Sequence, residues 1–306
     1  METYDTIIVG AGVTGYAAAM YAGRLGLKTL VIGETPGGTI IITDTVENYP
    51  GFIKLTGQEL ADNIKNHALD YKEFVNLKEG RVTKLERKDE KFIVHVKDEK
   101  YLAKTVIYAT GSKWRELKVP GHDEYKNKGV HYCALCDGFF YRGKIGAVIG
   151  GADSAAKDAL VLSEHAKKVY MIYRGSEIRP EPVNKKRVME KENIELIHDT
   201  NIIEILGDPV KGVTKVKLDN PYKGKDELEL DGVFIAIGHM PLSELAKEMG
   251  IKLNKKGEIM INRKSETNVP GFYAAGDIAD THFKQAITGV AEGVTAAHSA
   301  YEYIRR

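Results

Sequence analysis

The sequence of 306 residues has only two cysteines, one tryptophan and no long apolar run. Because a helix that crosses a bilayer needs about 20 consecutive apolar residues, the short apolar runs predict no membrane span. The charges nearly cancel, with 44 basic and 43 acidic residues and a formal net charge of +1. This balance gives no electrostatic argument for binding nucleic acid or an anionic membrane surface.

The N-terminal residues also lack the features of a secretory signal. They contain no basic segment and no cleavage site, and an apolar strand pattern begins at once. We therefore expect a cytoplasmic protein. Structural disulfides are rare in that compartment, so two cysteines spaced as Cys-x-x-Cys predict a catalytic or metal-binding role.

Glycine, in contrast, is abundant, and many of the 31 glycines end short apolar runs of the kind that form buried parallel strands. Five apolar runs are DTIIVG, TLVIG, KIGAVIG, KVYMIY and GVFIAIG, and all but KVYMIY end in glycine. Helical patterns follow the first and third of these. Strand, glycine-rich turn, helix and strand is the order of a nucleotide-binding βαβ unit.

This pattern occurs twice, over residues 10–111 and 150–238. In each copy an alternating polar and apolar segment precedes the final strand and predicts an antiparallel meander. Residues 243–306 have no glycine-rich opening, so we expect them to complete one of the two units. The predicted fold class is α/β, with two Rossmann-like, three-layer ββα nucleotide-binding domains.

The first glycine-rich turn, VGAGVTG, follows a strand pattern and opens a helix pattern. Gly10 permits the tight turn, Gly12 lets the backbone approach a pyrophosphate, and Gly15 lets the helix pack on the strand. Glu34 ends the next strand, where an acid suits a ribose hydroxyl. The alternative is a turn without a ligand, but the strand, helix and acid together favour a dinucleotide.

The second turn, VIGGADSA, is an imperfect fingerprint, because Ala152 stands where glycine allows close phosphate approach. Arg174 and Arg179 follow the next strand, which favours the 2′-phosphate of NADP(H). The alternative is that these arginines are solvated surface charges. The candidate contacts in the turn are Gly150, Gly151, Asp153, Ser154 and Ala155.

The only two cysteines, Cys133 and Cys136, are followed directly by Asp137. A structural zinc site commonly needs two such cysteine pairs, and His131 alone does not complete one. Two inert buried thiols are a further alternative. A redox dithiol explains the spacing best, and the carboxyl of Asp137 can move the proton that thiol–disulfide exchange requires.

Together these motifs resemble the low-molecular-weight thioredoxin reductase family of flavoproteins, over essentially the whole chain. The resemblance includes PGGT, VENYPG, CALCDGFFYRGK, AIGHMP, AAGD and KQAITGVAEG, in the family's order. It implies a discontinuous FAD-binding domain, residues 1–114 and 243–306. A pyridine-nucleotide domain, residues 115–242, is inserted in it and carries the Cys-x-x-Cys. It also implies a homodimer that reduces thioredoxin or a glutaredoxin-like small protein.

The resemblance further implies roles for individual residues. Cys136 would be the thiol next to the flavin, Cys133 would exchange with the partner's disulfide, and Asp137 would be the acid–base. The implied FAD-binding residues are Gly10, Gly12, Gly15, Glu34, Gly38, Thr39, Asn48, Gly276, Asp277, Gln285 and Ala286.

Three positions depart from the family pattern. Thr39 stands where glutamine is usual, Ala152 where glycine is usual, and the run YRGSEIR where HRR with a later arginine is usual. The last two departures bear on the electron donor. We predict NADPH as the donor, bound weakly and with reduced preference over NADH. We keep as alternatives a reductase fed by ferredoxin or a deazaflavin, and a flavin-binding module whose Cys-x-x-Cys is regulatory or binds metal.

Overall fold

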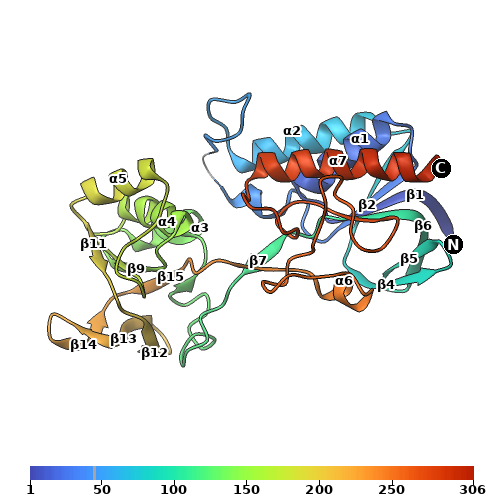
Figure 1. Cartoon of the computed structure of the whole chain (residues 1–306). Helices are drawn as coiled ribbons and strands as arrows, with labels where there is room; N and C mark the ends of the chain where they lie inside the picture. Colours follow the sequence, from blue (N-terminus) through green and yellow to red (C-terminus); the bar gives the residue numbers. More distant parts are fainter. Residues whose placement is uncertain (44–45) are drawn as a thin grey trace. The chain divides into compact units, whose positions relative to one another are not determined.

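A computed structural model describes residues 1–43 and 46–306 as two compact units (Figure 1). The first unit comprises residues 1–113 and 240–306, and the second comprises residues 114–239. The second unit is therefore inserted in the first. Where the chain passes between them, β7 (Ser112–Trp114) and β16 (His239–Pro241) form a two-stranded sheet.

The first unit is built on one sheet with the order β3-β2-β1-β6-β5-β4, in which β17 also pairs with β6. The long strand β6 joins two kinds of pairing. Its first half pairs antiparallel with β5, and its last three residues pair in parallel with β17. The strands are β1 (Glu2–Val9), β2 (Thr29–Gly33), β3 (Val75–Glu79), β4 (Val82–Lys88), β5 (Lys91–Val96), β6 (Glu99–Tyr108) and β17 (Phe272–Ala274).

Helices α1 (Val13–Arg24), α2 (Gly57–Asp70) and α7 (Ala286–Ile304) gather on one side of this sheet (Figure 1). Alanine dominates the buried face of α1, so this helix packs closely on the strands and on α7. A capping box of Thr56 and Glu59 starts α2 by satisfying backbone N–H groups that the helix leaves free. Two short helices, η1 (Gly38–Ile42) and α6 (Glu244–Glu248), complete the unit.

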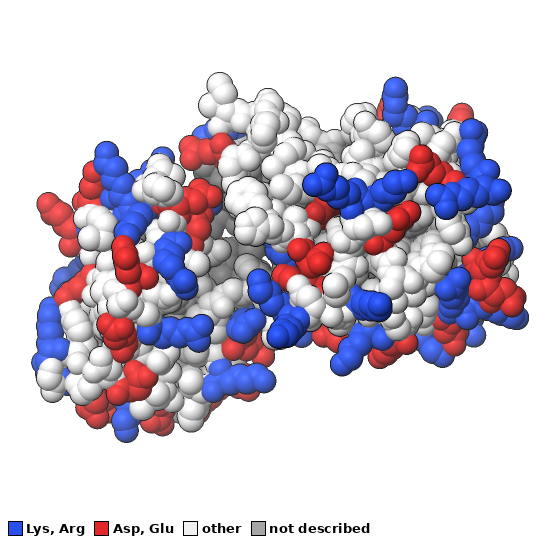
Figure 2. Space-filling view, in the orientation of Figure 1, with Lys and Arg blue, Asp and Glu red and all other residues white. Residues whose placement is uncertain are grey.

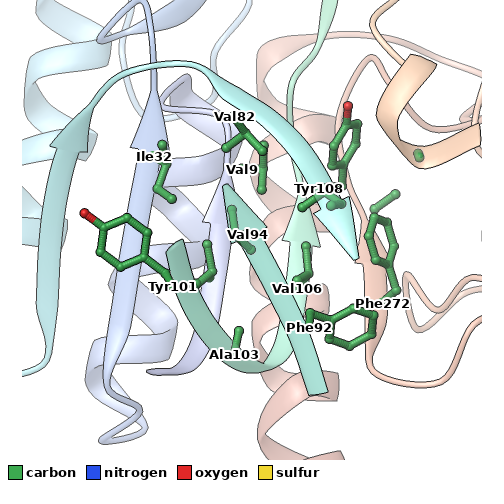
Figure 3. Close-up of a cluster of buried hydrophobic side chains, with 14 of the residues drawn as sticks. Val9, Ile32, Val82, Phe92, Val94, Tyr101, Ala103, Val106, Tyr108 and Phe272 are labelled. Carbon is green, nitrogen blue, oxygen red and sulfur yellow. The ribbon is translucent and has the colours of Figure 1, made fainter. Parts of the chain in front are cut away.

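A second core lies on the other side of the parallel strands, against the meander (Figure 3). Phe92 of β5 and Tyr108 of β6 both contact Phe272 of β17, with ring centroids 5.9 and 5.8 Å apart. Val9 and Ile32 bring the parallel strands to the same cluster. Helices, parallel sheet and meander thus form the three layers that the sequence predicts.

The second unit repeats this plan. Its parallel sheet has the order β11-β10-β9-β15-β8, and a separate antiparallel sheet has the order β12-β13-β14. The parallel strands are β8 (Val130–His131), β9 (Ile145–Ile149), β10 (Lys168–Ile172), β11 (Ile194–Ile197) and β15 (Gly232–Ile235). The meander strands are β12 (Ile202–Asp208), β13 (Gly212–Tyr222) and β14 (Lys225–Glu229). The helical elements are α3 (Ala134–Asp137), η2 (Gly138–Tyr141), α4 (Asp153–Ser163) and α5 (Pro182–Glu190).

The five quoted apolar runs form β1, β2, β9, β10 and β15, so these predicted strands are confirmed. On the face shown in Figure 2, basic and acidic side chains are interspersed over each unit. No helix in residues 1–43 and 46–306 combines the length and the apolar character that crossing a membrane requires.

Candidate active site

The first glycine-rich turn contains two glycines that packing requires and one that it does not. Gly10 has a φ of +122°, and a Cβ there would lie 2.1 Å from the carbonyl oxygen of Ala109. A Cβ on Gly15 would lie 1.9 Å from the carbonyl oxygen of Gly10. A Cβ on Gly12 would meet nothing closer than the Cα of Gly38, at 3.7 Å.

A Cβ at Gly12 would thus lie at ordinary van der Waals distance from its neighbours, so packing within the protein does not require glycine there. Gly12 is also the N-cap of α1, and no side chain caps this helix end. The first N–H groups of a helix attract anions when they are left uncapped. Bare backbone beside an uncapped helix end fits the pyrophosphate of a dinucleotide.

The other predicted FAD residues belong to the same unit and lie near the carboxyl ends of its parallel strands. Glu34 follows β2 and forms an exposed ion pair with Arg81, with 3.9 Å between nitrogen and oxygen. Gly38 and Thr39 begin η1, beside the fingerprint turn. In doubly wound sheets, this edge is where ligands bind.

Distant segments also meet here. Asn48 donates from Nδ2 to Oε1 of Gln285 at 2.9 Å, across 237 positions of sequence. Gln285 caps the N-terminus of α7, and Ala286 is the first residue of that helix. The structure thus joins the VENYPG and KQA segments, which sequence alone could place together only through the family resemblance.

Gly276 and Asp277 follow β17, and one neighbour of theirs was not predicted. Glu292 of α7 accepts a hydrogen bond from the backbone N of Gly276 at 2.8 Å, and another from the hydroxyl of Thr281. Lys284 donates to the carbonyl oxygen of Asp277 at 2.8 Å. The only feature of the sequence that could have pointed to Glu292 is its position as an acidic residue within a largely apolar helical segment.

In the second unit, Cys133 and Cys136 form a disulfide at the start of α3. Their Cα atoms are 5.4 Å apart, and Cys133 is the N-cap of the helix. The backbone N of Cys136 donates to the sulfur of Cys133 at 3.1 Å. A helix N-terminus stabilises a thiolate, so reduction of this bond would leave Cys133 well placed as a nucleophile.

The described residues contain no group of three or more His, Cys, Asp or Glu side chains arranged to hold a metal ion. Sulfurs joined in a disulfide are also not free to bind zinc. The disulfide therefore favours the redox interpretation of this motif.

Asp137, at the end of α3, belongs to a chain of hydrogen bonds that sequence analysis missed. Nδ1 of His131 lies 3.1 Å from Oδ2 of Asp137, and its Nε2 lies 2.9 Å from the hydroxyl of Tyr141. The imidazole stacks on Phe234, with centroids 5.1 Å apart. Burial lowers the pKa of His131, although Asp137 acts in the opposite direction. A neutral ring can then donate from Nδ1 to the carboxylate and accept from Tyr141.

A second carboxyl supports the same helix. Oδ1 of Asp158, on α4, accepts a hydrogen bond from the backbone N of Ala134 at 3.2 Å. Burial raises the pKa of Asp158 to about 6, although this hydrogen bond acts to lower it. Asp158 thus carries a proton in the folded protein at pH values where the unfolded chain would release it.

This raised pKa predicts a specific pH dependence of stability. The folded state holds the proton more tightly than the unfolded state, so the stabilisation is complete below about pH 4 and is lost as the pH rises through about 6. We expect Asp158→Asn, which keeps the acceptor for Ala134, to raise the free energy of unfolding by about 1–3 kcal/mol at about pH 8. Its advantage should vanish near pH 4.

Urea denaturation of both proteins across this pH range measures the effect, and Asp153 on the same helix supplies the control. Burial alone would raise the pKa of Asp153, but hydrogen bonds from Asn184, Lys157 and the backbone of Glu181 hold it below its ordinary value. Asp153→Asn should therefore lose stability at high pH and lose little at low pH. Equal destabilisation by both substitutions at about pH 8 would contradict the assignment for Asp158.

The second glycine-rich turn is tied to the chain that follows β10. Gly150 has a φ of +141°, and Ala152 is the N-cap of α4. Asp153 accepts hydrogen bonds from the backbone N of Glu181 at 2.9 Å and from Asn184 at 2.8 Å. Ser154 and Ala155 continue the first turn of α4. Asp153 therefore anchors the protein's own backbone in this structure.

The two predicted phosphate-binding arginines differ in their surroundings. Arg174 is exposed and has no hydrogen bond or ion pair within the described part of the chain. Arg179 donates from Nη2 to the hydroxyl of Tyr173 at 3.0 Å. The backbone N of Arg179 donates to the carbonyl oxygen of Gly151 at 2.6 Å. Tyr173 begins the YRGSEIR run that departs from the family pattern, and its contact with Arg179 is a feature that the sequence did not predict.

Comparison with known proteins shows the family to which the chain is similar. Residues 4–293 match the model of a family described as pyridine nucleotide-disulphide oxidoreductase. The thioredoxin reductase of Bacillus subtilis (strain 168) is 36% identical over 313 residues, which cover 99% of this chain and 95% of that protein.

Two solved structures are similar over their whole length. The crystal structure of Lactococcus lactis thioredoxin reductase in its FR conformation aligns with a TM-score of 0.93 at 35% identity, covering 99% of each chain. The crystal structure of T. acidophilum thioredoxin reductase aligns with a TM-score of 0.91 at 36% identity, again covering 99% of each chain.

Proposed function

The chain belongs to the pyridine nucleotide-disulphide oxidoreductase family, among its low-molecular-weight thioredoxin reductases, and on that premise we propose the path its electrons take. Electrons pass from NADPH to FAD, then to the Cys133–Cys136 disulfide, and then to a disulfide of a thioredoxin- or glutaredoxin-like protein. The observation that carries the proposal is the disulfide between the only two cysteines, at the start of α3. From the family resemblance we further propose that the protein is cytoplasmic and forms a homodimer.

The residues of the first unit fit FAD as the bound flavin. Gly12 and the uncapped start of α1 would hold the pyrophosphate, and Glu34 would hold the ribose. When bound, FAD supplies the two-electron chemistry that the protein's own side chains lack. The remaining proposed contacts are Gly10, Gly15, Gly38, Thr39, Asn48, Gly276, Asp277, Gln285 and Ala286.

The dithiol performs the exchange with the partner. The thiolate of Cys133 attacks one sulfur of the partner's disulfide, which breaks that bond and forms a mixed disulfide. Cys136 then attacks the sulfur of Cys133, which restores the internal disulfide and releases the partner's second thiol. Two electrons move from the enzyme to the partner, and the two protons of the dithiol end on the partner's thiols.

Asp137 is the proposed acid–base for these proton transfers, and His131 holds its carboxylate in place. A donor on Nδ1 fixes the rotamer of the carboxylate and leaves its other oxygen free to exchange a proton. Tyr141 in turn fixes the imidazole by its contact with Nε2. The proposed catalytic residues are therefore Cys133, Cys136 and Asp137, with His131 as a positioning residue.

In the second unit, Gly150, Gly151, Asp153, Ser154 and Ala155 form the proposed nucleotide turn. Arg174 and Arg179 are the proposed partners of a 2′-phosphate, since guanidinium groups form bidentate hydrogen bonds with phosphate. The exposure of Arg174 and its lack of a partner in the described residues support this role.

Anaerobic mixing of the yellow protein with NADPH, NADH, reduced ferredoxin or a reduced deazaflavin tests the proposal, followed at the flavin absorbance band. We expect NADPH to bleach the flavin and added oxidised thioredoxin to restore it. If only reduced ferredoxin or a reduced deazaflavin bleaches the flavin, that reductant takes the place of NADPH as the proposed donor, and the proposed disulfide chemistry stands. A colourless protein that does not take up FAD would overturn the whole proposal.

A further inference from the structure

The two units place different residues at one equivalent position. In the first unit Val9 pairs with Ile32, and the next residue after Ile32 is Gly33. In the second unit Ile149 pairs with Ile172, and the next residue is Tyr173. The backbone N of Gly10 donates to the carbonyl oxygen of Ile32 at 2.7 Å. In the same way, the backbone N of Gly150 donates to the carbonyl oxygen of Ile172 at 3.0 Å. Gly33 and Tyr173 therefore occupy corresponding places.

The residue that each of these two contacts in the glycine-rich turn also differs: it is an alanine in the first unit and a glycine in the second. Gly33 lies against Ala11, since a Cβ on Gly33 would be 2.4 Å from the Cβ of Ala11. Tyr173 lies against Gly151, since a Cβ on Gly151 would be 2.5 Å from the tyrosine ring. In the first unit the turn residue Ala11 thus closes on the bare backbone of Gly33, whereas in the second unit an aromatic ring lies on the bare backbone of Gly151.

A second glycine makes room for the same ring. A Cβ on Gly175 would lie 2.7 Å from the ring of Tyr173. The ring is thus bounded by Gly151 of the fingerprint turn and by Gly175, two residues after Tyr173 in sequence. Side chains at either position would displace it, so both glycines allow the ring to lie where it does.

The hydroxyl of Tyr173 also contacts the arginine expected to bind phosphate. Nη2 of Arg179 donates to this hydroxyl at 3.0 Å, while the backbone of Arg179 is bonded to Gly151. The nearby carboxylate of Glu177 is paired with Lys185. Arg179 is therefore held against the fingerprint turn by its own neighbours.

In a dinucleotide-binding βαβ unit, the ribose and any 2′-phosphate lie at the end of the second strand, next to the glycine-rich turn. We propose that Tyr173 is a specificity-determining residue of the second nucleotide site. Its ring takes up part of the space where the adenosine ribose would bind, and its hydroxyl accepts a hydrogen bond from Arg179 that a 2′-phosphate would otherwise accept. This rests on the proposed function. Nucleotides then bind weakly, and NADPH keeps little advantage over NADH.

Two substitutions separate the ring from the hydroxyl. Tyr173→Phe keeps the ring and frees Arg179, so it should tighten the binding of a 2′-phosphate by up to about tenfold, the worth of one charge-assisted hydrogen bond. Tyr173→Ser removes the ring, so it should tighten the binding of adenosine nucleotides with or without that phosphate, by about tenfold or more. Gly175→Arg alone should not restore a phosphate site, because the arginine would meet the ring.

Titration calorimetry of the full-length, FAD-loaded protein provides the test, with adenosine 2′,5′-bisphosphate and 5′-AMP as ligands. Neither ligand transfers electrons, so the readout is independent of turnover. Tyr170→Ser is the matched control: Tyr170 lies on β10, directly before the segment that holds Tyr173, and faces Tyr222, so both affinities should stay unchanged. Thermal unfolding of each variant checks that the fold is retained.

Unchanged affinity for both ligands in both Tyr173 variants would overturn the inference, and so would weaker binding after Tyr173→Ser, which would make the ring a stacking surface for adenine. These outcomes are separable from the proposed function. If NADPH reduces the wild-type flavin readily and the variants bind no better, the function stands and the inference falls. If the variants bind more tightly and no pyridine nucleotide reduces the flavin, the inference stands and the donor must be replaced.

Discussion

Cys133→Ser and Cys136→Ser should each lower the reduction of a thioredoxin disulfide to below about one thousandth of the wild-type rate, as removal of a catalytic nucleophile does elsewhere. Each substitution leaves one sulfur that cannot complete the exchange. The flavin should nevertheless still be reduced by its donor, because the proposed FAD residues all belong to the other unit. Steady-state turnover with thioredoxin and anaerobic flavin reduction measure the two halves separately.

Leu135→Met is the matched control, since it changes a residue between the two cysteines, nearly conserves its volume and keeps both thiols. It should retain most of the wild-type turnover. Full disulfide reductase activity in either cysteine variant would contradict the roles proposed for Cys133 and Cys136.

Gly12→Val should lower the affinity for FAD by about 100-fold or more, since the bulkier side chain removes close phosphate contacts, each a charge-assisted bond. The FAD-free protein should lose less unfolding free energy than with Gly15→Ala, because the Cβ at position 12 lies at an ordinary contact distance of 3.7 Å from its nearest neighbour. Flavin fluorescence titration gives the affinity, and urea denaturation of the FAD-free protein gives the stability.

Gly15→Ala provides the contrasting case within the same turn. Its Cβ would lie 1.9 Å from the carbonyl oxygen of Gly10, so the FAD-free protein should lose about 1–3 kcal/mol of unfolding free energy or more. Tight FAD binding by Gly12→Val would show that the backbone at Gly12 does not hold the pyrophosphate.

The fold could be predicted from the sequence because its signals are local. The strands β1, β2, β9, β10 and β15 are short apolar runs that end near a glycine, and the two units repeat the same order of elements. The parallel strands β3, β8 and β11 lack this signal and were not predicted. The two fingerprint turns follow β1 and β9 and open α1 and α4, as their spacing predicts. Such features depend on neighbours within about 30 residues, where periodicity is informative.

The parts that sequence analysis missed depend on the direction of single side chains. The sequence identifies His131 only as an incomplete zinc ligand, yet its ring packs against the buried Phe234 and Tyr141 and contacts Asp137. Asp158 reaches Ala134 across 24 positions only because α4 packs against α3. Neither spacing matches a known motif.

Tyr173 illustrates a different limit. The sequence showed only that a family phosphate-binding pattern was altered at this position. That the ring lies against Gly151, and that Arg179 donates to its hydroxyl, follows from packing that no periodicity encodes.

The number of electrons that the protein accepts tests the central claim most directly. Anaerobic titration with dithionite, followed at the flavin band, should require four electrons per FAD, two for the flavin and two for the Cys133–Cys136 disulfide. The Cys136→Ser variant should require two. A wild-type protein that is fully reduced by two electrons would show that the disulfide does not exchange electrons with the flavin, and would contradict the account.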